Sequence, residues 1–531
     1  MTISCLDNTL AVPGSVIKYG MFSVSLSVCL LHFRFYLCCI PVMEEEKKRT
    51  LNISNTPSHA NGSVEDTKMY IYDEKPQDQE DFEVFKKTAD CVDFRTVGWV
   101  SCLPLARSIT DALQVKATVI FLKIIFATGV LSIPLAMHDL GAVGGALCVI
   151  GFGVLNTYTA VIQGNFRNNH AHCHSIADMA EHVGGVALRE LTGVMFIIAY
   201  ILCTSSGIIG VATGINALSE HGACTVWFAF VATVVVIAAA SVRKFEQVSW
   251  LTWAGFTSIF VAVLIVVVAV TTRDRPAAAP QTGPFELDYV AIAHPTFVAG
   301  VTAAVNIFVS SAGTSAFLPV ISEMRNPRDY KKALFTCMGF VTAAYLTFSL
   351  VVYRWCGQWV ASPSLGSAGQ TVKKAAYGVG MVGLIVSACL YLHVAAKYVF
   401  VRILRDSRHL QHGTVVHWTT WLGCNVVLGA VSFIISQGVP IFNNILALAG
   451  SICFAPLAMT LPGWLWLYDY GSWRKGTAGQ QAAYWFHWLL ILLGLFVLVG
   501  GAYGTIQQII DEYNNGKIGS AFSCADNSGS T

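Results

Sequence analysis

The sequence predicts an all-α polytopic membrane protein with about eleven transmembrane helices. Of its 531 residues, 54% are hydrophobic and 12% are charged, which is about half the charged share of a soluble globular chain. Apolar runs of about 20 residues, the length that crosses a hydrocarbon core of ~30 Å as a helix, recur from Lys116 onward. This composition excludes a soluble enzyme, and the formal net charge of +2 argues against a nucleic-acid-binding surface.

Two regions precede the apolar runs. Residues 1–42 contain an apolar stretch interrupted by a histidine and an arginine, which is consistent with an extra hydrophobic segment or with a doubtful N-terminal extension ahead of Met43. Residues 43–111 hold nearly half of the 31 acidic residues, and we expect them to form a disordered cytoplasmic tail. The exposed lysines of this tail make it a candidate contact for a ubiquitin ligase and the endocytic machinery: Lys47, Lys48, Lys68, Lys86 and Lys87.

The apolar runs are expected to form one transmembrane domain over residues 112–510. Lysine and arginine are more frequent in the loops that a cytoplasmic N-terminus places inside, about 13 against about 6 outside, as the positive-inside rule requires. Residues 511–531 then form a short extracellular tail. The predicted spans are 117–138, 141–163, 191–217, 225–241, 248–270, 295–321, 333–355, 375–400, 414–436, 440–468 and 484–510.

The cysteines are too scattered to indicate a disulfide framework. Those inside apolar runs are expected to be small packing residues. Cys224 and Cys356 both fall on the outer side of this topology. Whether they form a disulfide stays open, because a sequence does not report the separation of two residues in space.

Two predicted spans carry signals for a break near the bilayer midplane. Gly129 and Pro134 interrupt the first span, and Gly313 and Pro319 interrupt the sixth. A break frees backbone N–H and C=O groups, which are tolerated in a membrane only where they line a cavity or bind something. The two breaks are five spans apart, as an inverted repeat of helices 1–5 and 6–10 would place them. The alternative is that these small residues serve helix packing.

Few ionisable side chains lie within the apolar runs, and each is a functional candidate because a charge is unfavourable there. Lys123 lies too deep to reach the interface, so its ammonium needs a partner. Lys397 is expected to extend to the inner interface. His393, four residues before it, is either a hydrogen-bonded packing residue or a proton-sensitive one.

The chain offers no support for catalysis or for a metal site. His170, His172 and His174 alternate along the sequence, and this spacing does not place them on one face of a helix. No nucleophile, zincin or phosphate-loop motif occurs in a suitable context. We therefore expect neither a metal nor an enzymatic activity.

Three motifs resemble those of the amino acid/auxin permease family, and most closely its N-system permeases of neutral amino acids in filamentous fungi. Residues 123–136 (KIIFATGVLSIPLA) are similar to the family's first-helix motif, and 450–463 (GSICFAPLAMTLPG) to its tenth-helix signature. Residues 175–185 (SIADMAEHVGG) are similar to its cytoplasmic loop motif, although Ile176 stands where an aromatic residue is usual. The resemblance covers about residues 112–510.

The resemblance implies a LeuT-type fold of eleven helices, a 5+5 inverted repeat with helices 1 and 6 unwound. It also implies secondary active transport, namely import of neutral aliphatic or aromatic amino acids by proton symport with alternating access. A zwitterion needs no charged side chain in such a site, because half-helix N-termini bind its carboxylate and half-helix C-terminal ends its ammonium. The residues carried over as the substrate site are Thr128, Gly129, Val130, Leu131, Ser132, Ser310, Ser311, Ala312, Gly313 and Thr314.

The coupling ion is predicted to be H⁺ in preference to Na⁺. A sodium site in this fold type usually takes hydroxyls from the eighth helix, and residues 386–389 offer one hydroxyl, that of Ser387. Lys123, Ser387 and His393 are the candidate coupling residues, and no other cofactor is expected. The resemblance favours a monomer in the plasma membrane over one in the vacuolar membrane. The alternative function is an amino acid sensor or a channel on the same fold.

Overall fold

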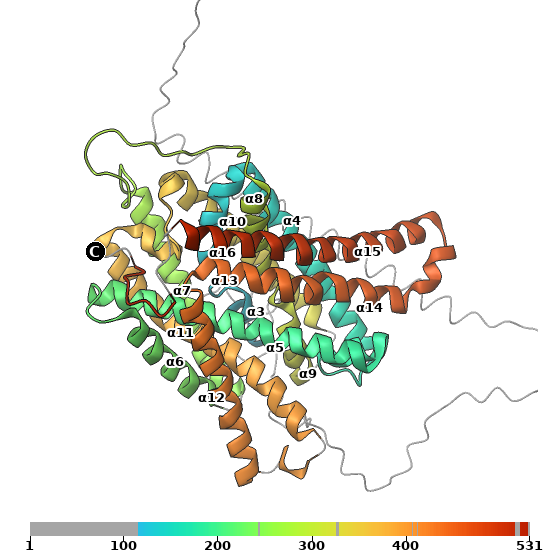
Figure 1. The fold of residues 1–531 in the computed structure, drawn as a ribbon. Coiled ribbons are helices and arrows are strands. Elements are labelled where there is room, and N and C mark those ends of the chain that lie inside the picture. Colours follow the sequence, from blue (N-terminus) through green and yellow to red (C-terminus); the bar gives the residue numbers. More distant parts are fainter. Residues whose placement is uncertain are drawn as a thin grey trace, which may run out of the picture. The chain divides into compact units, whose positions relative to one another are not determined.

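The computed structural model describes residues 115–242, 245–324, 329–405, 407–410, 413–515 and 521–528. The predictions for residues 1–42 and for the tail at 43–111, with its lysines, lie outside the described residues. Every regular element in the described part is helical (Figure 1). Nine helices of this part are long and apolar enough to cross a membrane, and two shorter apolar helices cover 118–131 and 225–240. The predicted all-α polytopic fold is thus confirmed.

The first predicted span is broken where its glycine and proline predicted a break. Helix α3 (Val115–Ile125) ends before a 3₁₀ turn at Gly129–Leu131, and α4 (Ile133–Asn169) then begins with Pro134 in its first turn. This α4 joins the second half of the first predicted span to the second span. The join is a kink at Gly141, whose φ of 75° is a conformation that side chains disfavour.

The sixth predicted span is broken in the same way. Helix α8 (Phe297–Val309) is followed by a 3₁₀ turn at Gly313–Ala316 and by the short helix α9 (Phe317–Glu323). Both predicted interruptions are therefore confirmed.

The other spans are continuous helices. In the tenth and eleventh spans, π-helical segments at Gly450–Phe454, Pro456–Thr460 and Val497–Gly501 continue one helix into the next. The bounds of these helices are α5 (Ile176–Ser219), α6 (Thr225–Ala240), α7 (Phe245–Thr271), α10 (Tyr330–Cys356), α11 (Gln370–Leu404), α12 (Val415–Gly438), α13 (Phe442–Ala449), α14 (Leu461–Asp469), α15 (Ala478–Phe496) and α16 (Ala502–Asn514).

The packing of these helices surrounds both breaks. Helix α3 packs against α7, α10 and α11, whereas α8 packs against α4, α13 and α16. The long helices α13–α14 and α15–α16 run beside one another (Figure 1). The interrupted segments are thus enclosed by continuous helices on several sides.

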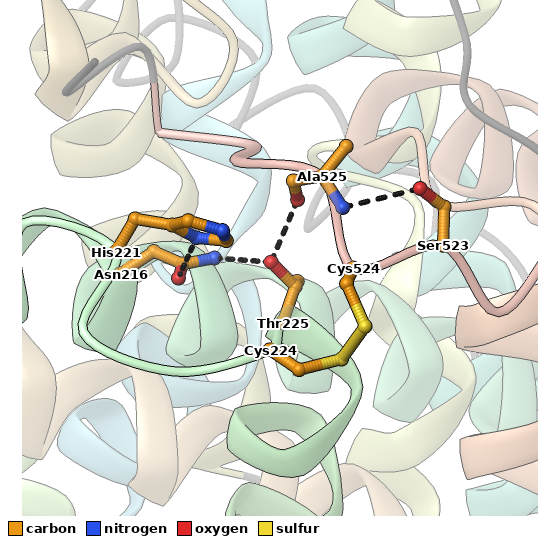
Figure 2. Close-up of a disulfide and its surroundings, with 7 residues drawn as sticks. All are labelled: Asn216, His221, Cys224, Thr225, Ser523, Cys524 and Ala525. Carbon is orange, nitrogen blue, oxygen red and sulfur yellow. Dashed lines mark hydrogen bonds between the residues drawn. A yellow bond between two sulfur atoms is a disulfide. The ribbon is translucent and has the colours of Figure 1, made fainter.

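A disulfide joins Cys224, at the start of α6, to Cys524 near the C-terminus (Figure 2). The pairing of Cys224 with Cys356, which the sequence left open, is therefore wrong, and Cys356 is a buried free thiol at the end of α10. The partners lie 300 positions apart in sequence. Nothing local in the sequence therefore indicates that Cys524 is the partner.

Hydrogen bonds fasten the residues on either side of Cys524 to the ends of several helices. Thr225 donates from Oγ1 to the carbonyl of Ala525 at 2.7 Å, and Asn216 of α5 donates from Nδ2 to Oδ1 of Asn527 at 2.8 Å. Figure 2 shows Thr225 lying between Asn216 and Ala525. Further bonds come from Lys373 of α11 to Ser528 and from Phe522 to the last turn of α12. We call residues 521–528 the tail strap, because they connect the ends of α5, α6, α11 and α12.

Replacing either cysteine of this disulfide should lower the melting temperature of the purified protein. Disulfides typically contribute about 2–4 kcal/mol to stability. Because each change removes the same cross-link, Cys224→Ser, Cys524→Ser and the double variant should lose stability equally, as measured by thermal unfolding in detergent. Cys148→Ser, at a free cysteine of α4, is the control. Additive losses in the double variant would contradict the cross-link.

Candidate functional site

The first break, residues 126–132 between α3 and α4, lies directly against the second break, residues 310–316 between α8 and α9. Ser310 at the end of α8 donates from Oγ to the carbonyl of Gly129 at 3.1 Å, and Ser132 donates to the same carbonyl at 2.8 Å. A Cβ atom at Gly129 would lie 2.8 Å from Cα of Ser310, so only glycine allows this approach. The first and sixth spans therefore meet at the positions where their helices are interrupted.

Asn156 of α4 donates hydrogen bonds to polar groups at the second break. Its Nδ2 lies 2.8 Å from Oγ of Ser311 and 3.3 Å from the carbonyl of Phe308, and its side chain is fully buried. An amide can donate two hydrogen bonds to such groups. This asparagine therefore connects two helices, which is the usual role of an amide side chain inside a membrane.

A small cavity lies between the breaks. Four predicted substrate residues line it, namely Thr128, Gly129, Ser310 and Gly313. The other six do not line it: Val130, Leu131, Ser132, Ser311, Ala312 and Thr314 are buried in or beside the breaks. The rest of the lining is Ile124, Ile125, Tyr200, Cys203, Val309, Tyr391, Leu446 and Phe454.

No charged side chain belongs to this lining. The polar groups that face the cavity are hydroxyls and the backbone of the breaks. We find here the combination of an apolar pocket with a few convergent polar groups that is typical of small-molecule sites.

Three tyrosine hydroxyls reach the backbone of the breaks. Tyr391 of α11 donates to the carbonyl of Ile124 at 3.3 Å, and Tyr200 of α5 donates to that of Gly313 at 3.4 Å. Tyr345 of α10 lies within hydrogen-bond distance of two carbonyls, that of Ile125 at 2.7 Å and that of Ser310 at 3.1 Å. Each tyrosine belongs to a continuous helix without a glycine or proline signal nearby. Sequence reasoning therefore missed all three.

Lys123 has the hydrogen-bond partners that an ammonium deep in a membrane span needs. Its side chain is fully buried, and Nζ donates to Oγ of Ser387 at 2.7 Å and to the carbonyl of Gly383 at 3.0 Å. Both partners belong to α11, so this bond joins α3 to α11. No carboxylate of the described residues lies within 4 Å of this ammonium. Two of the three predicted coupling residues, Lys123 and Ser387, are thus in contact.

His393 is not in contact with the other two coupling candidates. Its buried ring hydrogen-bonds through Nδ1 to the carbonyl of Ala240 at 3.1 Å and meets the ring of Trp421 at a centroid distance of 5.2 Å. These contacts connect α11 to α6 and α12. Of the two interpretations of His393, the geometry favours the packing residue.

The histidine-rich loop forms an interhelical contact. The rings of His170 and His182 stand 4.4 Å apart between centroids, and Nε2 of His170 lies 2.9 Å from Oδ1 of Asp469. Within the ranges that the structure describes, no three His, Cys, Asp or Glu side chains are grouped as metal ligands. The loop thus links the ends of α4, α5 and α14.

A buried cavity between two interrupted helices of a polytopic bundle is the arrangement of secondary transporters. The family model described as "Transmembrane amino acid transporter protein" matches residues 113–507. The chain therefore belongs to this family of amino acid transporters.

Known proteins are similar over most of the chain. A transmembrane transporter of Gibberella moniliformis is 48% identical over 490 residues, which cover 92% of this chain and 98% of that protein. The N amino acid transport system protein of Neurospora crassa is 26% identical and covers 77% of this chain and 87% of its own length. The crystal structure of MhsT in complex with L-phenylalanine is similar with a TM-score of 0.45 and 12% identity, over 75% of this chain and 97% of that one.

Gly129→Ala should reduce amino acid uptake by about tenfold or more. The added Cβ forces the two breaks apart, and overpacking of this kind typically costs about 1–3 kcal/mol. Uptake of a labelled amino acid, normalised to surface expression, measures the effect. Gly151→Ala is the control, because a Cβ at that position of α4 meets no atom within 4 Å. Wild-type uptake by Gly129→Ala would show that the close approach of the breaks is not required.

Proposed function

We propose that the protein imports neutral amino acids across the plasma membrane by proton symport with alternating access. The observation that carries this proposal is the uncharged cavity between two interrupted helices. A charged side chain on the substrate would lack a counter-charge there, and an unpaired charge in a membrane interior is strongly unfavourable. The cavity therefore suits substrates whose only charges are the α-ammonium and the α-carboxylate.

The backbone of the breaks supplies groups of both signs for such a zwitterion. Carbonyls at the end of α3 and near Gly313 are acceptors for an ammonium, and the N–H groups at the start of a half-helix are donors for a carboxylate. Tyr200, Tyr391 and Phe454 line the remainder of the cavity beside Leu446. These side chains favour an aliphatic or aromatic substrate side chain. The name of the Neurospora relative, N amino acid transport system protein, supports an amino acid as the substrate.

Lys123 supports proton coupling. Its ammonium occupies a position between α3 and α11 where a carbonyl and a hydroxyl converge, and oxygen ligands of this kind also hold coupling sodium ions in transporters. A fixed cation at this position would exclude a sodium ion by charge. When protonated, Lys123 holds α3 against α11. Loss of the proton removes the positive charge and weakens that contact, so that α3 can move during the transport cycle.

The tail strap supports the proposed orientation. Structural disulfides persist in oxidising compartments, not in the cytosol. The loop charges assign both partners of this disulfide, Cys224 and Cys524, to the outer side of the membrane. The resemblance to plasma-membrane permeases supports that membrane over the vacuolar one.

Lys123→Met should abolish the dependence of transport on the proton gradient. Concentrative uptake of labelled neutral amino acids by wild-type cells should be lost on addition of a protonophore. The variant should no longer concentrate amino acids. Any exchange of amino acids across the membrane that it still catalyses should proceed at the same rate whether or not protonophore is present. Lys374→Met is the control, since that lysine is partly exposed near the start of α11 and pairs with Glu220.

The outcomes of this experiment separate the candidate functions. Wild-type uptake that requires sodium and resists protonophore would overturn proton coupling. Amino acid binding by a surface-expressed protein that takes up none would favour the sensor over the transporter.

A further inference from the structure

We propose that Tyr345 is the positioning residue that couples the two interrupted helices, so that they move together during transport. This inference rests on the proposed function, and it assigns the coupling to a residue outside the substrate cavity. Tyr345 lies in the middle of α10, and its side chain is 2% exposed.

The hydroxyl of Tyr345 bridges the two breaks. It is 2.7 Å from the carbonyl of Ile125, the last residue of α3, and 3.1 Å from the carbonyl of Ser310, the residue that ends α8. Carbonyls at the end of a helix lack an intrahelical partner. One O–H group shared between these two acceptors therefore fixes the distance between the ends of the two half-helices.

The ring of Tyr345 fixes the hydroxyl in this position. It stacks on Phe126, the residue that follows α3, with a centroid distance of 5.6 Å and an interplanar angle of 28°. A stacked aromatic pair contributes packing in addition to its burial. The side chain is thus attached to the first break by its ring and to both breaks by its hydroxyl.

The other two tyrosines at the site do not make this bridge. Tyr391 bonds the carbonyl of Ile124 in the first break, and Tyr200 bonds that of Gly313 in the second. Both also line the cavity, whereas Tyr345 does not. Loss of the Tyr345 hydroxyl should therefore affect the movement of the breaks and leave the surface that contacts the substrate intact.

Tyr345→Phe should lower the maximal rate of uptake by about tenfold, which corresponds to the loss of one or two buried hydrogen bonds, with little change in KM. Tyr391→Phe should instead change KM. Tyr330→Phe is the matched control, because Tyr330 lies on the same helix, is fully buried and bonds one carbonyl, that of Ala160, away from both breaks. An unchanged maximal rate in Tyr345→Phe, or an equal loss in Tyr330→Phe, would overturn the proposal.

Hydrogen exchange of the purified full-length protein tests the bridge without reference to transport. Tyr345→Phe should increase amide exchange in both breaks, at residues 126–132 and 310–316. Tyr391→Phe should increase it in the first alone, and Tyr330→Phe in neither. Increased exchange in one break alone, or in neither, in the Tyr345 variant contradicts the bridge. Absence of amino acid uptake by the wild-type protein contradicts the proposed function and leaves this exchange result interpretable.

A second variant guards against failure of Tyr345→Phe to fold. Phe126→Leu removes the ring on which Tyr345 stacks and keeps the hydroxyl. It should lower the maximal rate by less than Tyr345→Phe does and increase exchange in both breaks. Wild-type exchange in this variant would count against the proposed role of the ring.

Discussion

Backbone polar groups that have no helical partner in a membrane interior are the constraint on which this structure depends. Each unpaired N–H or C=O group in hydrocarbon is unfavourable by several kcal/mol. The chain interrupts α3 at Ile125 and α8 at Val309, and so creates such groups twice. The continuous helices around the breaks, with their asparagine and tyrosine side chains, surround the freed groups and supply hydrogen-bond partners for several of them.

Several of these backbone groups also border the cavity. Ser310 and Ser132 satisfy the carbonyl of Gly129, and Asn156 reaches the carbonyl of Phe308. Tyr200 likewise reaches the carbonyl of Gly313. Gly129 and Gly313 also line the cavity, where a substrate can contact the same backbone groups. Helix N-termini carry a partial positive charge and helix C-termini a partial negative charge. A zwitterionic amino acid has a carboxylate for the first and an ammonium for the second. Stabilising the breaks and binding the substrate are thus two uses of one set of backbone groups.

Residues with a local signature could be predicted from the sequence. Gly129 and Gly313, each followed by a proline, marked the two interruptions, and the depth of Lys123 in its span indicated a buried partner. Residues whose role depends on tertiary packing could not be predicted. Tyr345 belongs to an uninterrupted apolar helix, and only the packing of α10 against α3 places its hydroxyl at both breaks. The same holds for Cys524, which pairs with a cysteine 300 positions away, and for His393, whose ring faces α6 and α12 away from the site.

The most direct test of a substrate site formed by the two breaks is a cryo-electron microscopy map of the full-length protein with a neutral amino acid such as leucine. Density for the amino acid should lie between Gly129 and Gly313, with both its ammonium and its carboxylate within hydrogen-bond distance of backbone groups of the two breaks. Density at another site, or charged groups of the substrate bound by side chains away from the breaks, would contradict it.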